Sequence, residues 1–148
     1  MSEAAIIAQL KTILEGVSGI GTVYAYEPYT PDLRRFKELF VAGGRVNAVT
    51  VTREATRAVE RTNTQVERQH RFVIRWYYAV DTEGTTETAF QALLEAAFTA
   101  LLDNYTLGGT AETSTPLQVD SVRPVMFAGV LCHRAEMSLE AQELVTPS

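Results

Sequence analysis

The residues that could do chemistry in this 148-residue sequence are few and scattered. His70 and His133 are its two histidines, and Cys132 is its one cysteine. His133 and Cys132 are neighbours on an expected strand, where successive side chains point to opposite faces, so they cannot bind one metal ion together. We interpret both histidines as structural residues and Cys132 as a small packing residue. We therefore expect no catalytic site, no metal site and no cofactor site.

Three glutamates and two glycine pairs are the remaining candidates for catalysis or phosphate binding. Glu136, Glu140 and Glu143 lie on one expected strand, and without a cleft they do not make an acid–base pair. The glycine pairs at 43–44 and 108–109 end helical segments, and neither opens a helix after a strand as a phosphate-binding loop does. The sequence therefore predicts a protein that is not an enzyme.

Arginine and glutamate gather in a long polar stretch between two expected strands. A strand-like run from Arg45 to Arg53 leads into polar residues as far as Glu67, and an alternating strand follows from His70 to Val80. Such a long excursion is uncommon in a compact domain unless it has a function. We interpret residues 53–71 as a long β-hairpin with an extended, mobile tip, and a disordered surface loop is the alternative. The candidate interface residues are Arg53, Arg57, Glu60, Arg61, Arg68, Arg71, Arg75 and Tyr77.

The strand from His70 to Val80 alternates between two kinds of side chain. Its expected core face comprises Phe72, Ile74, Trp76, Tyr78 and Val80. Its second face comprises Arg71, Val73, Arg75 and Tyr77. Charge mixed with bulky groups suits a partner surface, and an ordinary solvent-facing side of an antiparallel sheet is the alternative.

The elements around this hairpin follow from apolar spacing and turn residues. The expected helices carry apolar stripes at Ile6, Leu10, Ile13, Leu14 and Val17, and at Phe90, Leu93, Leu94, Ala97, Phe98 and Leu101. A short helix with Leu33, Phe36 and Phe40 is also expected. Further strands are expected at 22–26, at 117–124 and at 130–143.

This order of elements predicts the fold class. Only the first two strands are separated by a crossover long enough to make them parallel, and the other links favour hairpins. We expect one α+β domain over residues 1–148, with a mainly antiparallel sheet, two main helices packed on one face and a protruding β-hairpin.

Composition limits the kind of protein further. The net charge of -5 and the strand-like alternation around Trp76 argue against a nucleic-acid-binding face. A single cysteine fits a reducing compartment. The start of the chain is not a signal peptide, and no apolar run is long enough to span a membrane. Of the 13 cationic residues only Lys11 and Lys37 are lysines, a bias that indicates either interface arginines or a GC-rich genome.

The whole pattern resembles the tail terminator proteins of long-tailed bacteriophages. The similarity covers nearly the whole chain and is one of order and texture rather than of a signature residue. The first helix ends near Gly16, a Val-Thr-Val-Thr-Arg strand occupies 49–53, and the arginine-rich hairpin leads to a strand at 70–77. The long helix ends in Leu-Gly-Gly at 107–109, and a closing strand occupies 129–139.

The resemblance implies a virion protein that acts through interfaces. Such a protein forms a ring, usually of six subunits, that caps the tail tube, stops its polymerisation and offers a surface for head docking. The partners would be further copies of the chain, the tail tube protein and a head–tail connector protein. Genomic DNA would pass through the lumen without specific binding, and assembly would take place in the host cytoplasm. The hairpin would supply half of the ring contact, with Glu136, Glu140 and Glu143 as candidate acceptors.

Two alternatives stay open. The first is another head–tail connector or tail-completion protein, which would bind a portal complex rather than a tube. The second is a small-molecule-binding α+β domain, which would have an apolar pocket with converging polar groups between its sheet and its helices.

Overall fold

The structure is a computed structural model that describes residues 3–26, 38–42, 45–61, 65–80, 85–127 and 129–145. Within these ranges the side chains of Ala42, Val59, Glu60 and Arg61 are outside the description. The expected short helix with Leu33 and Phe36 also lies outside the described residues.

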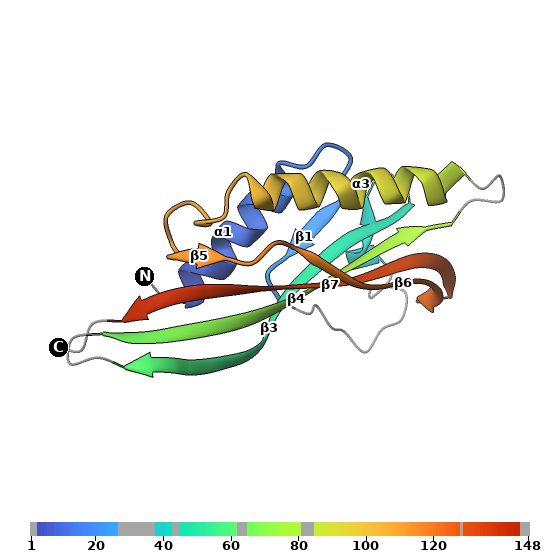
Figure 1. The fold of residues 1–148 in the computed structure, drawn as a ribbon. Coiled ribbons are helices and arrows are strands. Elements are labelled where there is room, and N and C mark those ends of the chain that lie inside the picture. The colour runs from blue at the N-terminus through green and yellow to red at the C-terminus, as the bar shows by residue number, and fades with distance from the viewer. Residues whose placement is uncertain are drawn as a thin grey trace.

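One mixed sheet carries two helices on one face (Figure 1). The helices are α1 (Glu3–Glu15) and α3 (Thr85–Leu102). The strands are β1 (Thr22–Tyr24), β2 (Val41–Ala42), β3 (Arg45–Arg61), β4 (Val66–Ala79), β5 (Thr113–Ser114), β6 (Gln118–Phe127) and β7 (Val130–Val145). The order in the sheet is β1-β3-β4-β7-β5, with β2 paired to β3 and β6 paired to β7. The predicted α+β class and the placement of the helices are confirmed.

Parallel pairing occurs where the sequence allowed it. Strand β1 runs parallel to β3, whereas the other pairs in the sheet are antiparallel. The chain between β1 and β3 is long enough for the crossover that a parallel pair needs.

Each helix buries the stripe that its apolar spacing predicts. Helix α1 buries Ile6, Leu10 and Leu14, which lie one turn apart on a single face. Helix α3 buries a similar stripe and begins at the expected cap, with Thr86 itself buried. Both stripes pack on the sheet face that carries Val49, Val51, Phe72, Ile74 and Trp76. The main core is therefore a single layer between sheet and helices.

The polar stretch between the two long strands is itself strand. Strands β3 and β4 pair from Asn47 and Tyr78 as far as Arg61 and Val66, with bulges after Arg53 and Ala58. Strand β7 follows on the other side of β4 to Val145. The predicted long β-hairpin is confirmed, and the alternative of a disordered loop is wrong over residues 53–61 and 65–71. The tip that joins the two strands lies outside the described residues. Backbone pairing between three strands supplies the order that apolar residues do not.

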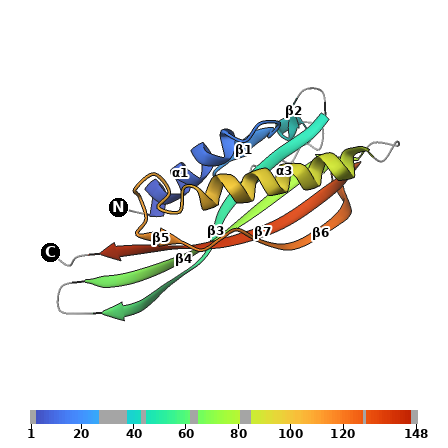
Figure 2. The ribbon, with the colours of Figure 1, turned by 45° about the horizontal axis from the view of Figure 1, so that its top comes forward.

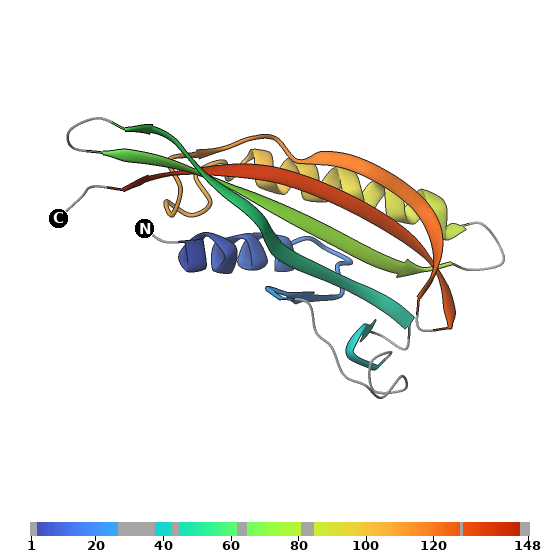
Figure 3. The same cartoon turned by 90° about the horizontal axis from the view of Figure 1, so that it is seen from below.

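The far ends of β3, β4 and β7 form an arm that extends beyond both helices (Figures 1 and 2). We call residues 55–61, 66–71 and 140–145 the arm. Seen from below, the three strands twist together as they leave the region under the helices (Figure 3).

The opposite sheet face is also partly covered. Phe40, Val46, Ala48, Ala79 and Cys132 form a second buried cluster there, and Tyr77 packs against it. The ring of Tyr77 stacks on Phe127 at 4.2 Å between centroids. Val73, further along the same face, is also buried. This face is therefore only partly open to solvent or to a partner. Val73 was expected on a partner surface and is buried instead, and Tyr77 is partly covered by the second cluster.

Candidate protein interface

The described arginines of the hairpin divide between the two faces of the sheet. Alternation along β4 places Arg68 with the inward-facing His70 and Phe72, and Arg53 is the partner of Phe72 across β3. The other face of the sheet, which the helices do not cover, carries Arg57, Arg71 and Arg75. The eight residues expected at the interface therefore do not form one continuous patch. The side chains of Glu60 and Arg61 lie outside the described part.

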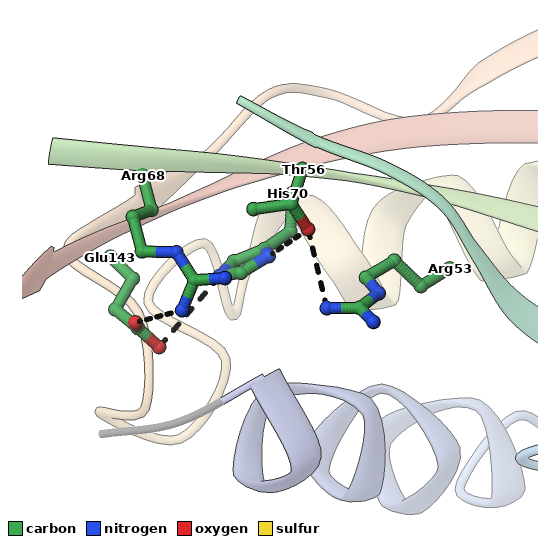
Figure 4. Close-up of polar contacts among 5 residues, drawn as sticks. All are labelled: Arg53, Thr56, Arg68, His70 and Glu143. Atoms are coloured by element: carbon green, nitrogen blue, oxygen red, sulfur yellow. Dashed lines mark hydrogen bonds and ion pairs between the residues drawn. The ribbon is translucent and has the colours of Figure 1, made fainter. Parts of the chain in front are cut away.

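A buried polar cluster occupies the helix-facing side at the base of the arm (Figure 4). His70 is fully buried, and its Nδ1 lies 2.8 Å from Thr56 Oγ1. Thr56 Oγ1 also accepts a hydrogen bond from Arg53 Nη1 at 3.3 Å. Glu143 pairs with Arg68 at 3.5 Å, and its other carboxylate oxygen lies 3.7 Å from His70 Nε2. Here the apolar core gives way to polar and charged side chains that lie close to one another.

Burial sets the protonation of His70. Desolvation is the largest influence and lowers the pKa of His70 below 6.5, because the charged imidazolium loses its water. The carboxylate of Glu143 opposes this shift, while Arg68 and Arg53 add to it. Neither His70 Nε2 nor Glu143 Oε2 has a hydrogen-bond partner. The neutral imidazole is therefore the form that this site favours at pH 7.

The position of Glu143 corrects an expectation. Glu143 is only 1% exposed, so it is not a surface acceptor for a neighbouring subunit. The signal was present in the sequence, because Met137, Leu139 and Ala141 face the core and alternation places Glu143 on the same side.

The helix-free face carries exposed polar pairs. Arg71 Nε lies 3.4 Å from Glu54 Oε1, and Arg57 Nη2 donates to Gln69 Oε1 at 2.8 Å. Exposed pairs of this kind contribute at most about 1 kcal/mol, because water screens them and both side chains lose entropy. A partner can therefore compete for these guanidinium groups at little cost.

Glu136 is also engaged within the chain. It lies 3.5 Å from Arg75 Nε and accepts from Arg134 Nη2 at 3.1 Å. The Arg134 guanidinium in turn lies over the ring of Tyr77, 5.9 Å from its centroid. Of the three expected acceptors only Glu140 has neither a buried carboxylate nor a described ion pair.

Sequence reasoning missed the surface formed by β6. The sequence predicts a strand at 117–124 but does not indicate an exposed apolar surface on it, because a bulge between Val119 and Ser121 interrupts the alternation. Val119, Val122 and Met126 are all exposed. The irregular spacing of these apolar residues was the available signal.

Searches for metal sites, for membrane-spanning helices and for similar proteins do not identify the family of this chain. Among the described residues, no group of three or more His, Cys, Asp or Glu side chains could hold a metal ion. Nor is any helix in the described part of the chain long and apolar enough to cross a membrane. The sequence matches no protein-family model and no curated protein.

Proposed function

We propose that this protein is a structural subunit that caps the end of a phage tail tube as a ring. The ring would stop tube polymerisation and provide the surface on which the head docks. It would lie at the head-proximal end of the tail, and six copies is the number that the sequence resemblance implies. The tube protein, a head–tail connector and the DNA passing through the lumen would be its neighbours.

The arm carries this proposal. Three strands leave the helix-covered core together (Figure 3). The described arginines of β3 are exposed, and those of β4 are half-buried. An isolated protrusion adds little to its own core, whereas a neighbour can bury it. Arginine suits that role because its planar guanidinium can make two hydrogen bonds to a carboxylate.

The filled core favours this proposal over a small-molecule-binding domain. Between the helices and the sheet, Trp76, Phe90 and Leu94 belong to one buried cluster. The described cavity between α3 and β6 is about 220 Å³, below the usual range of about 300–1,000 Å³ for ligand sites. A larger cavity of about 470 Å³ lies beside Arg71, Gln118 and Ser138, and no residue of the described helices lines it, so it is not the pocket between sheet and helices that such a domain would have. A different head–tail connector remains the closest competitor, and binding to a portal complex instead of a tube would identify it.

The test is the native mass of the purified protein alone and with purified tail tubes, followed by imaging. A closed ring, or density at one end of the tube only, is the expected result. A protein that stays monomeric and leaves the tubes undecorated would overturn the proposal.

A further inference from the structure

Strand β6 presents a row of exposed apolar side chains along one edge of the sheet. Val119, Val122, Met126 and Leu131 are each between 39% and 69% exposed. Val119 pairs with Met137, Val122 with Ala135, and Met126 with Leu131. Because Met137 and Ala135 face the helices, all four exposed side chains lie on the helix side of the sheet. We call these four residues the β6 shelf.

The shelf deepens into a groove against α3. A cavity of about 220 Å³ lies there, with Glu87 and Gln91 on the α3 side and Val122, Pro124 and Leu131 on the strand side. Large exposed apolar side chains rimmed by polar groups are typical of protein–protein contacts. The shelf therefore has the composition of an interface that is uncovered in the single chain.

The backbone of β6 is poorly suited to pairing with another strand. Pro124 has no N–H, and the bulge between Val119 and Ser121 breaks the regular ladder. Both features are common protections against edge-to-edge pairing. A partner on this edge is therefore held by side chains on the shelf rather than by strand addition.

The segment that contains α3 and β6 is acidic, and Glu87 of this segment lines the groove. Residues 85–127 contain five acidic residues and one basic residue, Arg123, a formal charge of -4. The acidic residues are Glu87, Glu95, Asp103, Glu112 and Asp120, and all five are exposed. None of them forms an ion pair with another described residue. Glu87 at the groove has no cationic partner among the described residues and can therefore accept a guanidinium group from another chain.

The β3–β4 hairpin of the arm, near the opposite edge of the same sheet, has the complementary charge. Residues 53–71 contain five arginines and three glutamates, a formal charge of +2. The β7 part of the arm adds two carboxylates, Glu140 and the buried Glu143, which pairs with Arg68. Arg53 and Arg57 are exposed on β3, next to exposed Ala55 and Ala58. Past Thr50 no described strand pairs with the outer side of β3, so this edge is open in the described part of the chain.

We propose that the arm of one copy docks on the β6 shelf of the next copy. The aliphatic stems of the arm arginines would cover the shelf, and their guanidinium groups would reach the carboxylates around it. Because arm and shelf are different surfaces on different edges, the contact is head-to-tail, which is the kind of contact that a closed ring requires. This inference rests on the proposed ring function and replaces the β7 glutamates with acceptors on the α3–β6 side.

Cysteine cross-linking tests the contact directly. In a Cys132→Ala background, the Arg57→Cys/Met126→Cys double variant is treated with a short bis-maleimide. The expected product is a ladder of covalent oligomers that ends at the ring number. Each single cysteine variant should give almost no cross-linked product. A head-to-tail contact brings residue 57 of one copy beside residue 126 of another copy, and it does not bring two copies of the same residue together. Dimers from either single variant would indicate a two-fold contact and overturn the inference.

A second pair of variants separates this inference from the ring proposal. Met126→Asp/Leu131→Asp should weaken self-association at least tenfold, since it replaces two of the apolar side chains that the arginine stems would cover with hydrated carboxylates. Ala92→Asp/Thr99→Asp adds the same charge to exposed positions of α3 and should leave association within twofold. Rings that survive the shelf changes would overturn the arm–shelf contact and leave the ring proposal standing. If only tube binding were lost, the shelf would belong to the tube protein. A wild-type protein that neither associates nor cross-links would overturn both.

Discussion

His70 makes stability at the base of the arm sensitive to pH. Burial lowers the pKa of His70 below the 6.5 of a free histidine, so the unfolded chain takes up this proton more readily than the folded one. The stabilisation is complete above the unfolded pKa and is lost as the pH falls below it. One such group changes the free energy of unfolding by at most about 1.4 kcal/mol per pH unit.

Urea denaturation at about pH 7.5 and about pH 5.5 checks this sign. The wild-type protein should lose stability at the lower pH, and His70→Gln should lose clearly less because the amide does not take up a proton. A control substitution at an exposed, uncharged position of α3, Gln91→Asn, should keep the wild-type loss. Equal losses in wild type and His70→Gln would show that other groups set the pH dependence.

Trp76 tests the core at the same scale. Its ring is fully buried against Phe90 at 5.5 Å between centroids, and its Nε1 donates to Asn47 Oδ1 at 2.9 Å. Trp76→Ala should cost about 3–5 kcal/mol, through the cavity and the unpaired amide that it leaves. The exposed Tyr105→Ala should stay within about 0.5 kcal/mol in the same denaturation experiment. A near-neutral Trp76 variant would contradict the inward register of β4.

Among the elements, the short strand β1 depends on a close approach between two backbones. A Cβ added to Gly21 would overlap the carbonyl group of Asn47, which cannot move without disturbing β3. Gly21→Ala should therefore lower the free energy of unfolding by about 1–3 kcal/mol. Thermal unfolding beside the exposed Ser18→Ala, expected to be near neutral, gives the comparison. An unchanged melting temperature for Gly21→Ala would mean that β1 adjusts freely.

The elements also show what periodicity can and cannot predict. Helices α1 and α3 were predictable because their apolar residues recur at helical spacing and bury one face. The outer half of β3 was predicted only from its place between two strands, because residues such as Glu54, Thr56 and Arg57 give no apolar alternation. Its order comes from pairing with β4, which β7 supports from the far side. Backbone pairing between strands that are distant in the sequence cannot be recognised from the pattern of neighbouring residues.

The candidate interface was predictable in part for the same reason. The sequence indicated the arginine-rich hairpin, but it did not show which face each arginine occupies or that Glu136 and Glu143 are already paired. Registers between distant strands decide those points. The β6 shelf depends on the position of α3 beside β6, which no spacing within β6 reveals.

At the scale of the whole molecule, the β3–β4 hairpin of the arm has a positive formal charge and the α3–β6 side has a negative one. Arg57→Glu/Arg61→Glu should leave the monomer folded, since Arg57 is exposed and substitutions at exposed positions usually cost under about 0.5 kcal/mol. The same change should weaken self-association about tenfold, because it turns attraction at the rim of the shelf into repulsion. Analytical ultracentrifugation measures both the fold-change and the loss of association as salt rises from about 0.05 M to about 0.5 M.

Arg123→Glu is the control that fixes the sign of this effect. Arg123 is exposed on β6 and is the one basic residue among residues 85–127. Reversing the charge of Arg123 makes the α3–β6 side more acidic. Arg123→Glu should therefore strengthen association with the positively charged hairpin of the arm or leave it unchanged. A general loss of solubility or folding would weaken association in both variants alike. Opposite responses to charge reversal on the two surfaces are expected only when those surfaces meet, because each surface then experiences the field of the other.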